Sequence, residues 1–583
     1  MFGTKQIFYE PGQRENPGSE NSPARLLSAR QAGIRQLKTN YLGMKKQIVL
    51  FIFLIIISYA GKTQEKQGFG CYTDRDVYIS GETVLAKIFT PKDNPSRIVH
   101  IDLINKQGTR ITGGSMEISN NQADGFLELP DSLSSGTYLL RAYLKNTAAQ
   151  LKIIREIWIT NRFEGLEKTN QMNRATASEK IQEKATGQIS IEGVAPKYQT
   201  NTPIAASIRI DPTLGKEIDG NLLVCIAQTN PGFEPAAFAW KSDQSGTSLS
   251  ESKGVILSGT VTDKKTQAPA PGITVYLTIP DSIPGFQYYT TKNDGHFYFL
   301  LDKYYGPVEA VVQCFGNNPV QRLKLTLEDH LSKIGDLPKF TSQNIPEDFK
   351  NSISANIEAI TLQKIFGQEK ELVMAPPVRK REVYPYYGMP TVTVDPKLFI
   401  DLPNFNEISK ELLHGVKYRN FNNEPTLQVI NTPMHNFFEE APLILLDGIP
   451  IRDLNLIKDL SSADIDRVDI CQTERYYGDL RFQGVVAIYT KKADSSRIPE
   501  SDQLIRLNLE TIQVSASLAP TPPLAPNIPD LRQIFYWNPK VDPAQTLSVN
   551  CTTSAITGKF KLVVRGRLKD GTLIFTEKQF EVN

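Results

Sequence analysis

The sequence predicts a multidomain, mainly β protein with one small α/β domain, and three observations support this. The chain has 583 residues, 40% of them hydrophobic, which is enough for about four domains of ~150 residues each. Short runs that alternate apolar and polar residues, and that open on glycine turns, recur along most of its length. In residues 442–492, by contrast, apolar residues spaced three apart lie between short strands, as on one face of a short helix.

The first 60 residues are predicted to contain an export signal. An apolar run, 48–58, follows two lysines that come after Met44, and this run is too short to span a ~30 Å hydrocarbon core. The residues just beyond the run place small side chains where a signal peptidase reads them. We therefore expect residues 44–60 to be a signal peptide and residues 1–43 an over-long N-terminus, with an uncleaved membrane anchor as the alternative.

Charge and cysteine content exclude several classes of function. The formal net charge is +2 with 22% charged residues, so no global field points to nucleic acid or to an anionic membrane surface. Five cysteines are spread along the chain, and an odd, dispersed set in an exported protein argues against a disulfide framework. The chain has no C-x-x-C pair, which argues against thiol redox chemistry.

Residues 69–160 follow an all-β pattern that carries specific motifs. Val84, Ala86 and Ile88 alternate with polar residues, and further strands open on glycine turns. A Tyr-x-x-Gly-Glu element begins at Tyr78, and a Gly-x-Tyr strand follows it. Together these motifs resemble a macroglobulin-like, Ig-like β-sandwich, in which the tyrosines are expected to pack at the sandwich ends.

A polar stretch, 161–187, is predicted to be a linker, and residues 188–250 repeat the first pattern less strongly. This second region resembles another macroglobulin-like domain. The protease traps of that family need a thioester in a Gly-Cys-Gly-Glu-Gln run, and no cysteine of this chain lies in one. Covalent trapping is therefore excluded. An inhibitor without a thioester would need a cleavable bait segment, for which residues 171–187 are the candidate.

Residues 254–330 carry a sharper set of motifs. Gly-x-Val-x-Asp, Pro-x-x-Gly-x-x-Val and Thr-x-x-Asp-Gly-x-Phe elements fall on Gly259, Val261, Asp263, Pro269, Gly272, Val275, Thr291, Asp294, Gly295 and Phe297. They resemble the carboxypeptidase-regulatory-like, or transthyretin-like, β-sandwich. We expect Asp263 and Asp294 to form turns, with a calcium site as the alternative. The domain carries none of a carboxypeptidase's zinc ligands.

The segment 331–383 is interpreted as a helix and a linker. The unit that follows, 384–495, combines an apolar strand, an Asp447-Gly448 dipeptide that suits a tight hairpin turn, a Tyr477-Gly478 pair and a closing strand opened by glycine. This order of elements resembles the plug domain of TonB-dependent outer-membrane receptors. The resemblance implies a small α/β domain that presents loops to a ligand or to a barrel wall.

The receptor barrel itself is not expected in this chain. After Lys492, 91 residues follow, whereas about 22 strands of ~10 residues would need more than ~220. A Pro-rich linker, 517–529, interrupts the strand pattern of that tail. Residues 530–583 then return to alternating strands with a turn at Asp570-Gly571, and they resemble a closing macroglobulin-type β-sandwich.

No enzymatic constellation is found in the sequence. The five histidines are isolated, and none has the spacing of a zinc site. A G-x-S-x-G nucleophile elbow and a phosphate-binding loop are both absent. Neighbouring carboxylates such as Glu439 and Glu440 point to opposite faces of an extended chain. We therefore expect no catalytic residue, no cofactor and no metal.

The sequence thus predicts a non-enzymatic, exported binding or scaffold protein, in the periplasm or at the outer membrane of a Gram-negative cell. Its plug-like domain would dock a ligand or a protein partner of the envelope, such as an outer-membrane barrel. Nucleic acid is not expected as a partner, and membrane association is peripheral at most. Because paired aromatic residues are favoured at interfaces, Tyr476, Tyr477 and Arg481 in the loop 472–481 are the candidate contacts.

Three alternatives stay open. The Tyr477-Gly478 pair could pack only the core of the plug-like domain and contact no partner. For the whole protein, one alternative is a thioester-free protease inhibitor of macroglobulin type. The other is an accessory subunit of a TonB-linked outer-membrane uptake system.

Overall fold

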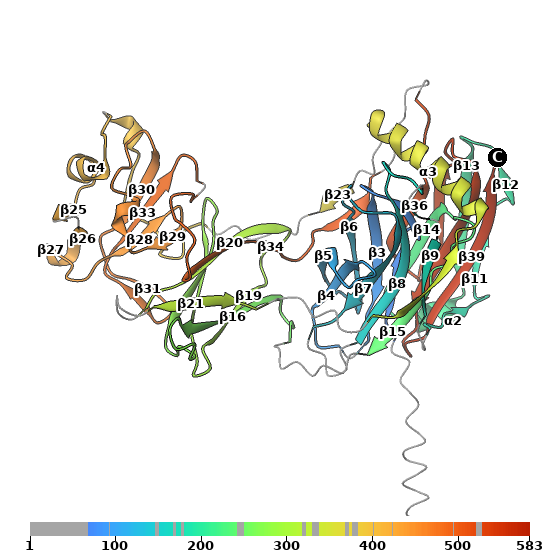
Figure 1. Ribbon diagram of the computed structural model, residues 1–583, viewed down its shortest axis with the longest axis horizontal. Helices are drawn as coiled ribbons and strands as arrows, with labels where there is room; N and C mark the ends of the chain where they lie inside the picture. Colours follow the sequence, from blue (N-terminus) through green and yellow to red (C-terminus); the bar gives the residue numbers. More distant parts are fainter. Residues whose placement is uncertain are drawn as a thin grey trace, which may run out of the picture. The chain divides into compact units, whose positions relative to one another are not determined.

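The computed structural model describes most of the chain after residue 67. The described residues are 68–583 without 93, 146–150, 167–168, 170, 177–179, 242–249, 317–321, 329–336, 368–371, 376–382, 400, 422–423, 494 and 520–527. The predicted over-long N-terminus and signal peptide lie outside them. The described chain is mainly β and is divided among many separate sheets, which confirms the predicted fold class (Figure 1). Within these residues, no helix has the length and apolar character needed to cross a membrane.

The first β-sandwich packs a three-stranded sheet, β1-β3-β6, against a larger sheet in the order β15-β8-β7-β4-β5, with β2 paired to β8. Its strands are β1 (Gly70–Thr73), β2 (Val77–Ile79), β3 (Thr83–Phe89), β4 (Ile98–Ile104), β5 (Arg110–Glu117), β6 (Gln122–Glu128), β7 (Gly136–Tyr143), β8 (Leu151–Thr160) and β15 (Ala237–Lys241). Tyr78 is buried in its core, as expected for a packing residue. The edge strand β15 comes from the stretch 188–250, which the sequence assigned to the next domain.

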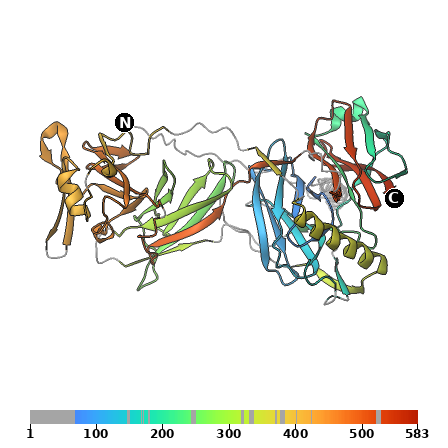
Figure 2. The ribbon, with the colours of Figure 1, turned by 90° about the horizontal axis from the view of Figure 1, so that it is seen from above.

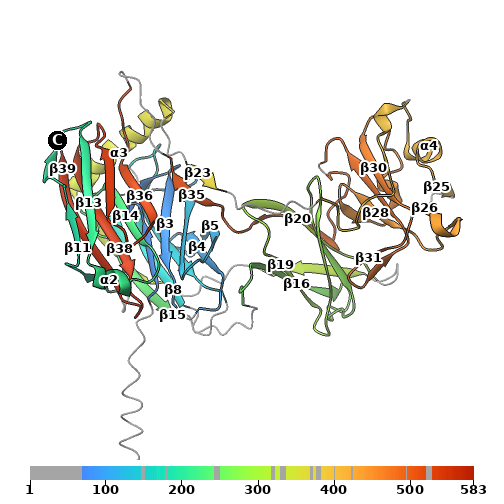
Figure 3. The same cartoon turned by 180° about the vertical axis from the view of Figure 1, so that it is seen from behind.

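The second β-sandwich is built from two distant parts of the chain. Its sheets are β10-β39-β38-β14-β36, with β12 paired to β39, and β11-β13-β37. Its elements are β10 (Lys184–Ala185), β11 (Ile189–Glu192), β12 (Lys197–Tyr198), β13 (Pro203–Ile210), α2 (Pro212–Glu217), β14 (Leu222–Gln228), β36 (Ile534–Val541), β37 (Leu547–Thr552), β38 (Gly558–Arg567) and β39 (Leu573–Val582). Teal and red strands accordingly lie side by side in Figure 3.

This arrangement differs from the two separate domains, 188–250 and 530–583, that the sequence indicated. β14 pairs with β38 along one edge and with β36 along the other, and both parts contribute to one hydrophobic core. Residue alternation identifies a strand and its buried face, but it does not identify the strand's neighbours.

The third β-sandwich contains the sheets β19-β16-β21 and β18-β17-β20-β34. Its strands are β16 (Val255–Asp263), β17 (Thr274–Ile279), β18 (Gly285–Thr290), β19 (His296–Leu301), β20 (Pro307–Cys314), β21 (Leu323–Leu327) and β34 (Leu504–Glu510). Asp263 and Asp294 accept backbone N–H hydrogen bonds in turns, as predicted. β34 reaches this sheet only after the plug-like domain, and Figure 2 shows it in orange-red beside the green strands.

Residues 384–495, which we call the plug-like domain after the resemblance described above, form a small α/β unit. Its main sheet has the order β24-β30-β33-β28-β29, in which β28 and β33 are parallel, and two smaller sheets are β25-β26-β27 and β31-β32. Its elements are β24 (Val392–Val394), η1 (Pro396–Leu398), α4 (Phe405–Glu411), β25 (Val416–Phe421), β26 (Glu424–Asn431), η2 (Thr432–Met434), β27 (Asn436–Phe437), β28 (Leu443–Leu446), β29 (Ile449–Ile451), η3 (Leu454–Leu456), β30 (Ile465–Cys471), β31 (Arg475–Tyr477), β32 (Leu480–Phe482) and β33 (Val485–Thr490).

The Asp447-Gly448 turn joins β28 to β29 as predicted. Leu446 lies opposite Ile449, so the loop has two residues. Both have positive φ, +50° at Asp447 and +82° at Gly448, which is the backbone requirement of a type I′ hairpin turn. The short helix expected after β29 is instead the single 3-10 turn η3. Its N-terminus is capped by the Asp453 side chain, which accepts a hydrogen bond from the Asn455 backbone N–H.

The segments predicted as linkers also contain paired strands. β9 (Gln171–Thr176) pairs with β22 (Lys339–Asn344), and β23 (Leu372–Ala375) pairs with β35 (Ser515–Leu518). The helix expected between β22 and β23 is α3 (Glu347–Ile365). The chain order is therefore nested: the plug-like domain is inserted into the third sandwich, and the third sandwich is inserted into the second.

Candidate partner-binding site

The hairpin β31-β32 holds all three candidate contact residues. Tyr476 lies opposite Arg481, and Tyr477 lies opposite Leu480. Gly478 occupies the first position of the two-residue loop with φ of +57°, a position that favours glycine in tight hairpins. Because side chains alternate along a strand, Tyr476 and Tyr477 must point to opposite faces of the hairpin.

The first face is exposed and carries a connected polar group. The Tyr476 side chain is 64% exposed, and its hydroxyl donates to Glu474 Oε2 at 2.7 Å. Arg481 donates to the other oxygen of the same carboxylate. The hydrogen bond from Arg481 lowers the pKa of Glu474, and the hydrogen bond to Glu474 raises the pKa of both Arg481 and Tyr476. Glu474 therefore holds the tyrosine and the arginine in one orientation.

The second face lies against the third sandwich. The half-buried Tyr477 donates from its hydroxyl to the Phe286 carbonyl oxygen at 2.8 Å. Its ring contacts those of Phe286, Tyr288 and Tyr386. Tyr477 is thus engaged within the chain, so Tyr476 and Arg481 are the two candidate residues that the structure leaves on the accessible face. The tyrosine also does more than pack the plug-like core, because its hydrogen-bond partner belongs to another domain.

The loop of the hairpin continues this contact. The Asp479 backbone N–H donates to the Tyr288 hydroxyl at 2.8 Å. A Cβ on Gly478 would lie 2.1 Å from that hydroxyl oxygen, so a side chain at this position would displace the Tyr288 hydroxyl. The Tyr477-Gly478 pair, which the sequence identified as a plug-like motif, is therefore a docking element between two domains.

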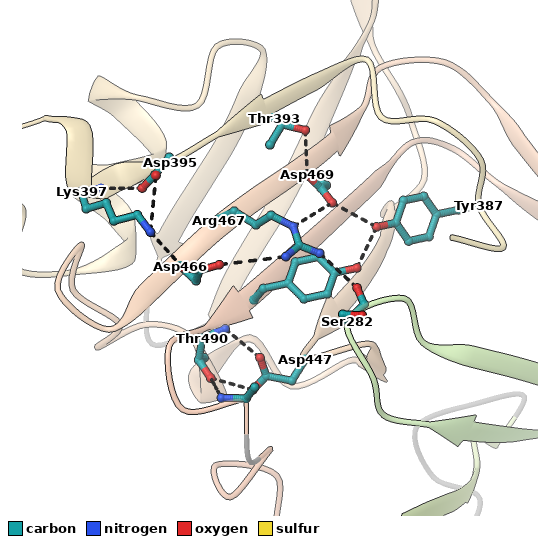
Figure 4. Close-up of polar contacts among 12 residues, drawn as sticks. Ser282, Tyr387, Thr393, Asp395, Lys397, Asp447, Asp466, Arg467, Asp469 and Thr490 are labelled. Atoms are coloured by element: carbon teal, nitrogen blue, oxygen red, sulfur yellow. Dashed lines mark hydrogen bonds and ion pairs between the residues drawn. The ribbon is translucent and has the colours of Figure 1, made fainter. Parts of the chain in front are cut away.

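Arg467 on β30 makes a second contact between the plug-like domain and the third sandwich (Figure 4). It donates to the Ser282 carbonyl oxygen at 3.3 Å, and its guanidinium lies 3.7 Å from the centroid of the Tyr489 ring. Asp469 lies beside it, 3.5 Å from Nε, and accepts from Thr393 at 2.8 Å. Burial raises the pKa of Tyr489, so this ring stays neutral beneath the cation.

Sequence reasoning missed the aromatic residues that receive Tyr477. Phe286 and Tyr386 stack with their centroids 4.0 Å apart, although they are 100 residues apart in the chain. The Tyr-Pro-Tyr-Tyr-Gly run at 384–388 was a visible signal, because dense aromatic runs favour interfaces. Its partner strand β18 could not be identified from local pattern.

A serine, a histidine and a glutamate also come together in the first sandwich, which the sequence did not indicate. His100 contacts Ser115 Oγ through Nδ1 at 2.9 Å and Glu251 Oε2 through Nε2 at 2.6 Å. Ser115 is 3% exposed and the other two are fully buried. A substrate cannot reach this serine in the structure, so we interpret the group as a packing network.

In the described part of the chain, no group of three or more His, Cys, Asp or Glu side chains could hold a metal ion. His330 lies outside that part. The five cysteines are free, and four of them are buried.

Comparison with known proteins gives distant similarities. No protein-family model and no curated protein matches the chain. Matching structures include Salmonella alpha-2-macroglobulin reacted with methylamine (9% identity, 88% of this chain, 39% of that chain, TM-score 0.19) and native Escherichia coli alpha-2-macroglobulin (10%, 88%, 40%, 0.21). A tandem repeat from the extending region of a large adhesion protein also matches (9%, 86%, 96%, 0.13). This chain spans about two fifths of the macroglobulins' length, and TM-scores this low carry no argument about function.

Proposed function

We propose that this protein is an exported, non-enzymatic binding or scaffold protein of the Gram-negative envelope, and that the exposed face of the hairpin β31-β32 docks a protein partner. One observation carries the proposal: the hairpin is fixed on one face and presents an ordered tyrosine and arginine on the other. Tyr and Arg, together with Trp, are the residues enriched among those that dominate interface energies. Glu474 orders both side chains before binding, which reduces the entropy lost on association.

The hydrogen bonds that hold the plug-like domain and its hairpin against the third sandwich support this role. Tyr477, Asp479 and Arg467 each hydrogen-bond to the third sandwich or to its loops. A further hydrogen bond joins Gln313 Nε2 of β20 to the Pro450 carbonyl oxygen at 3.0 Å. A binding site on a rigidly held element keeps its geometry better than one on a free loop. The proposed envelope location rests on the signal-like segment 44–60.

Substitution of Tyr476 and Arg481 tests the docking face. In intact cells, crosslinking followed by mass spectrometry should recover at least about tenfold less partner with Tyr476→Ala or Arg481→Ala, the loss expected when an interface anchor is truncated. Tyr384→Ala is the matched control, because Tyr384 is 52% exposed in the same domain and lies outside the hairpin. If both hairpin variants recover the same partners in the same amounts as the unmodified protein, the docking face is elsewhere.

Part of the bait segment that the inhibitor alternative needs, 171–187, is paired in a sheet, whereas residues 180–187 are exposed or half-buried. The first six residues of 171–187 form β9, which pairs with β22 along its whole length, and Met172 is fully buried. A protease needs an accessible, extended segment, which a strand paired in this way does not offer. The identity of the crosslinked partner would distinguish a subunit of an uptake system from a free-standing scaffold.

A further inference from the structure

A cavity of about 310 Å³ lies between the first and second sandwiches. Its floor is the face of β14, β38 and β39 that carries Cys225, Ala227, Lys561, Val563 and Glu577. One wall is formed by residues 73–77 and Arg155 of the first sandwich, and the other by the loop 229–235. This volume is at the small end of the ~300–1,000 Å³ typical of ligand pockets.

Most charged groups of the lining are neutralised, but two on the floor are not. Arg155 pairs with Asp76, and Arg565 pairs with Glu183. Lys561 and Glu577, in contrast, form no ion pair with any described residue. Glu577 lies opposite Val563, and Lys561 is two residues before Val563 on the same strand. Lys561 and Glu577 are therefore diagonal neighbours, about 7–8 Å apart. Glu577 accepts a hydrogen bond from Gln579 at 3.2 Å, and Lys561 acts electrostatically on Asp76, but neither forms an ion pair, so the floor presents a positive and a negative charge side by side.

The lining also contains buried polar groups without partners. Thr73, Arg155 and Gln228 are 5%, 6% and 9% exposed, and each has a side-chain polar atom that makes no hydrogen bond. Buried polar groups are nearly always satisfied in native proteins. A polar molecule in this cavity would satisfy these atoms.

The apolar part of the lining limits what that molecule can be. Val77, Phe233 and Val563 are buried side chains that line the same cavity. A suitable ligand combines a cationic group, an anionic group close to it, and a small apolar body. We infer that this cavity binds a zwitterionic small molecule of the free amino acid class, with its carboxylate on Lys561 and its ammonium on Glu577.

Calorimetric titration of the full-length protein with L-leucine and two analogues tests the inference. N-acetyl-L-leucine lacks the ammonium and L-leucinamide lacks the carboxylate. Leucine should bind, and each analogue should bind at least about tenfold more weakly, because each lacks one hydrogen bond to a charged group. Lys561→Met should remove the preference for leucine over leucinamide. Glu577→Gln should remove the preference for leucine over N-acetyl-leucine.

Lys578→Met is the matched control, because Lys578 follows Glu577 on β39 and lies outside the lining. It should bind leucine as the unmodified protein does. Absence of leucine binding overturns the inference, as does equal binding of all three compounds by the unmodified protein. Circular dichroism verifies that each variant is folded. Glu577 is exposed, so Glu577→Gln keeps the test decisive if Lys561→Met is not folded.

Discussion

At the scale of single residues, Glu251 connects the start of the third sandwich to the first sandwich through side-chain and backbone contacts. Its carboxylate contacts His100 at 2.6 Å and Lys145 at 3.6 Å, and its carbonyl oxygen accepts from the Arg97 backbone N–H at 2.9 Å. Burial alone would raise the pKa of this carboxyl, but His100 and Lys145 outweigh burial and the pKa lies below its ordinary value. The charged form of Glu251 therefore stabilises the fold.

The sign of this shift predicts how stability depends on pH. A carboxylate whose pKa is lowered by folding contributes stability above its unfolded pKa, near 4.5, and loses it as pH falls through the lower folded value. Glu251→Gln should therefore lower the free energy of unfolding at pH 7 by about 1–3 kcal/mol. The difference in the free energy of unfolding between the variant and the unmodified protein should become smaller below pH 4.5.

Urea unfolding at pH 7 and at several acidic values measures this gap. Glu128→Gln serves as the control, because Glu128 is exposed on β6 and its replacement should change little at either pH. A gap that stays constant from neutral to acidic pH would mean that the charge of Glu251 contributes nothing to stability.

At the scale of elements, the hairpin β31-β32 shows how one turn residue positions a surface. Gly478 has positive φ and approaches Tyr288 so closely that a Cβ would displace the tyrosine hydroxyl. The turn thereby places Tyr477 against the third sandwich, and strand alternation then directs Tyr476 outward. The orientation of the exposed face of the hairpin therefore depends on the contact that its other face makes with the third sandwich.

Gly478→Ala should release the hairpin from its support. The substitution adds ~1–2 kcal/mol of backbone strain at positive φ and a clash with Tyr288, so amide hydrogen exchange in residues 475–482 should become faster. Gly367→Ala is the matched control, because Gly367 has φ of +64° and open space around its Cβ position. It shares the backbone strain without the clash. Unchanged exchange in 475–482 would show that the hairpin does not depend on this contact.

At the scale of the whole molecule, the nested insertions decide which segments can fold independently. β14 cannot form its sheet with nearby segments, because its neighbours in the sheet, β36 and β38, follow more than 300 residues later in the chain. Strands that need such distant partners gain little from local structure. The insertion also means that two chain segments connect the plug-like domain to the sandwiches.

Fragments of the second sandwich test this assembly. Residues 184–228 and residues 530–583, expressed separately, should be unfolded by circular dichroism and rapidly digested. The same two pieces joined by a flexible linker should give a β spectrum and a cooperative thermal transition. Cooperative folding of 530–583 alone would instead support the separate domain that the sequence indicated.

Local features of this protein were determined by the sequence itself. The strands, the Asp447-Gly448 turn, the opposite directions of Tyr476 and Tyr477 and the mainly β class all follow from alternation and from the backbone freedom of glycine, which act over a few residues. What lies opposite each side chain was decided by the tertiary structure. Pairing of β14 with β36 and β38, docking of Tyr477 on Phe286 and the contact of His100 with Glu251 join segments 100 or more residues apart. Those partners are selected by the packing of whole faces, which no short stretch of sequence encodes.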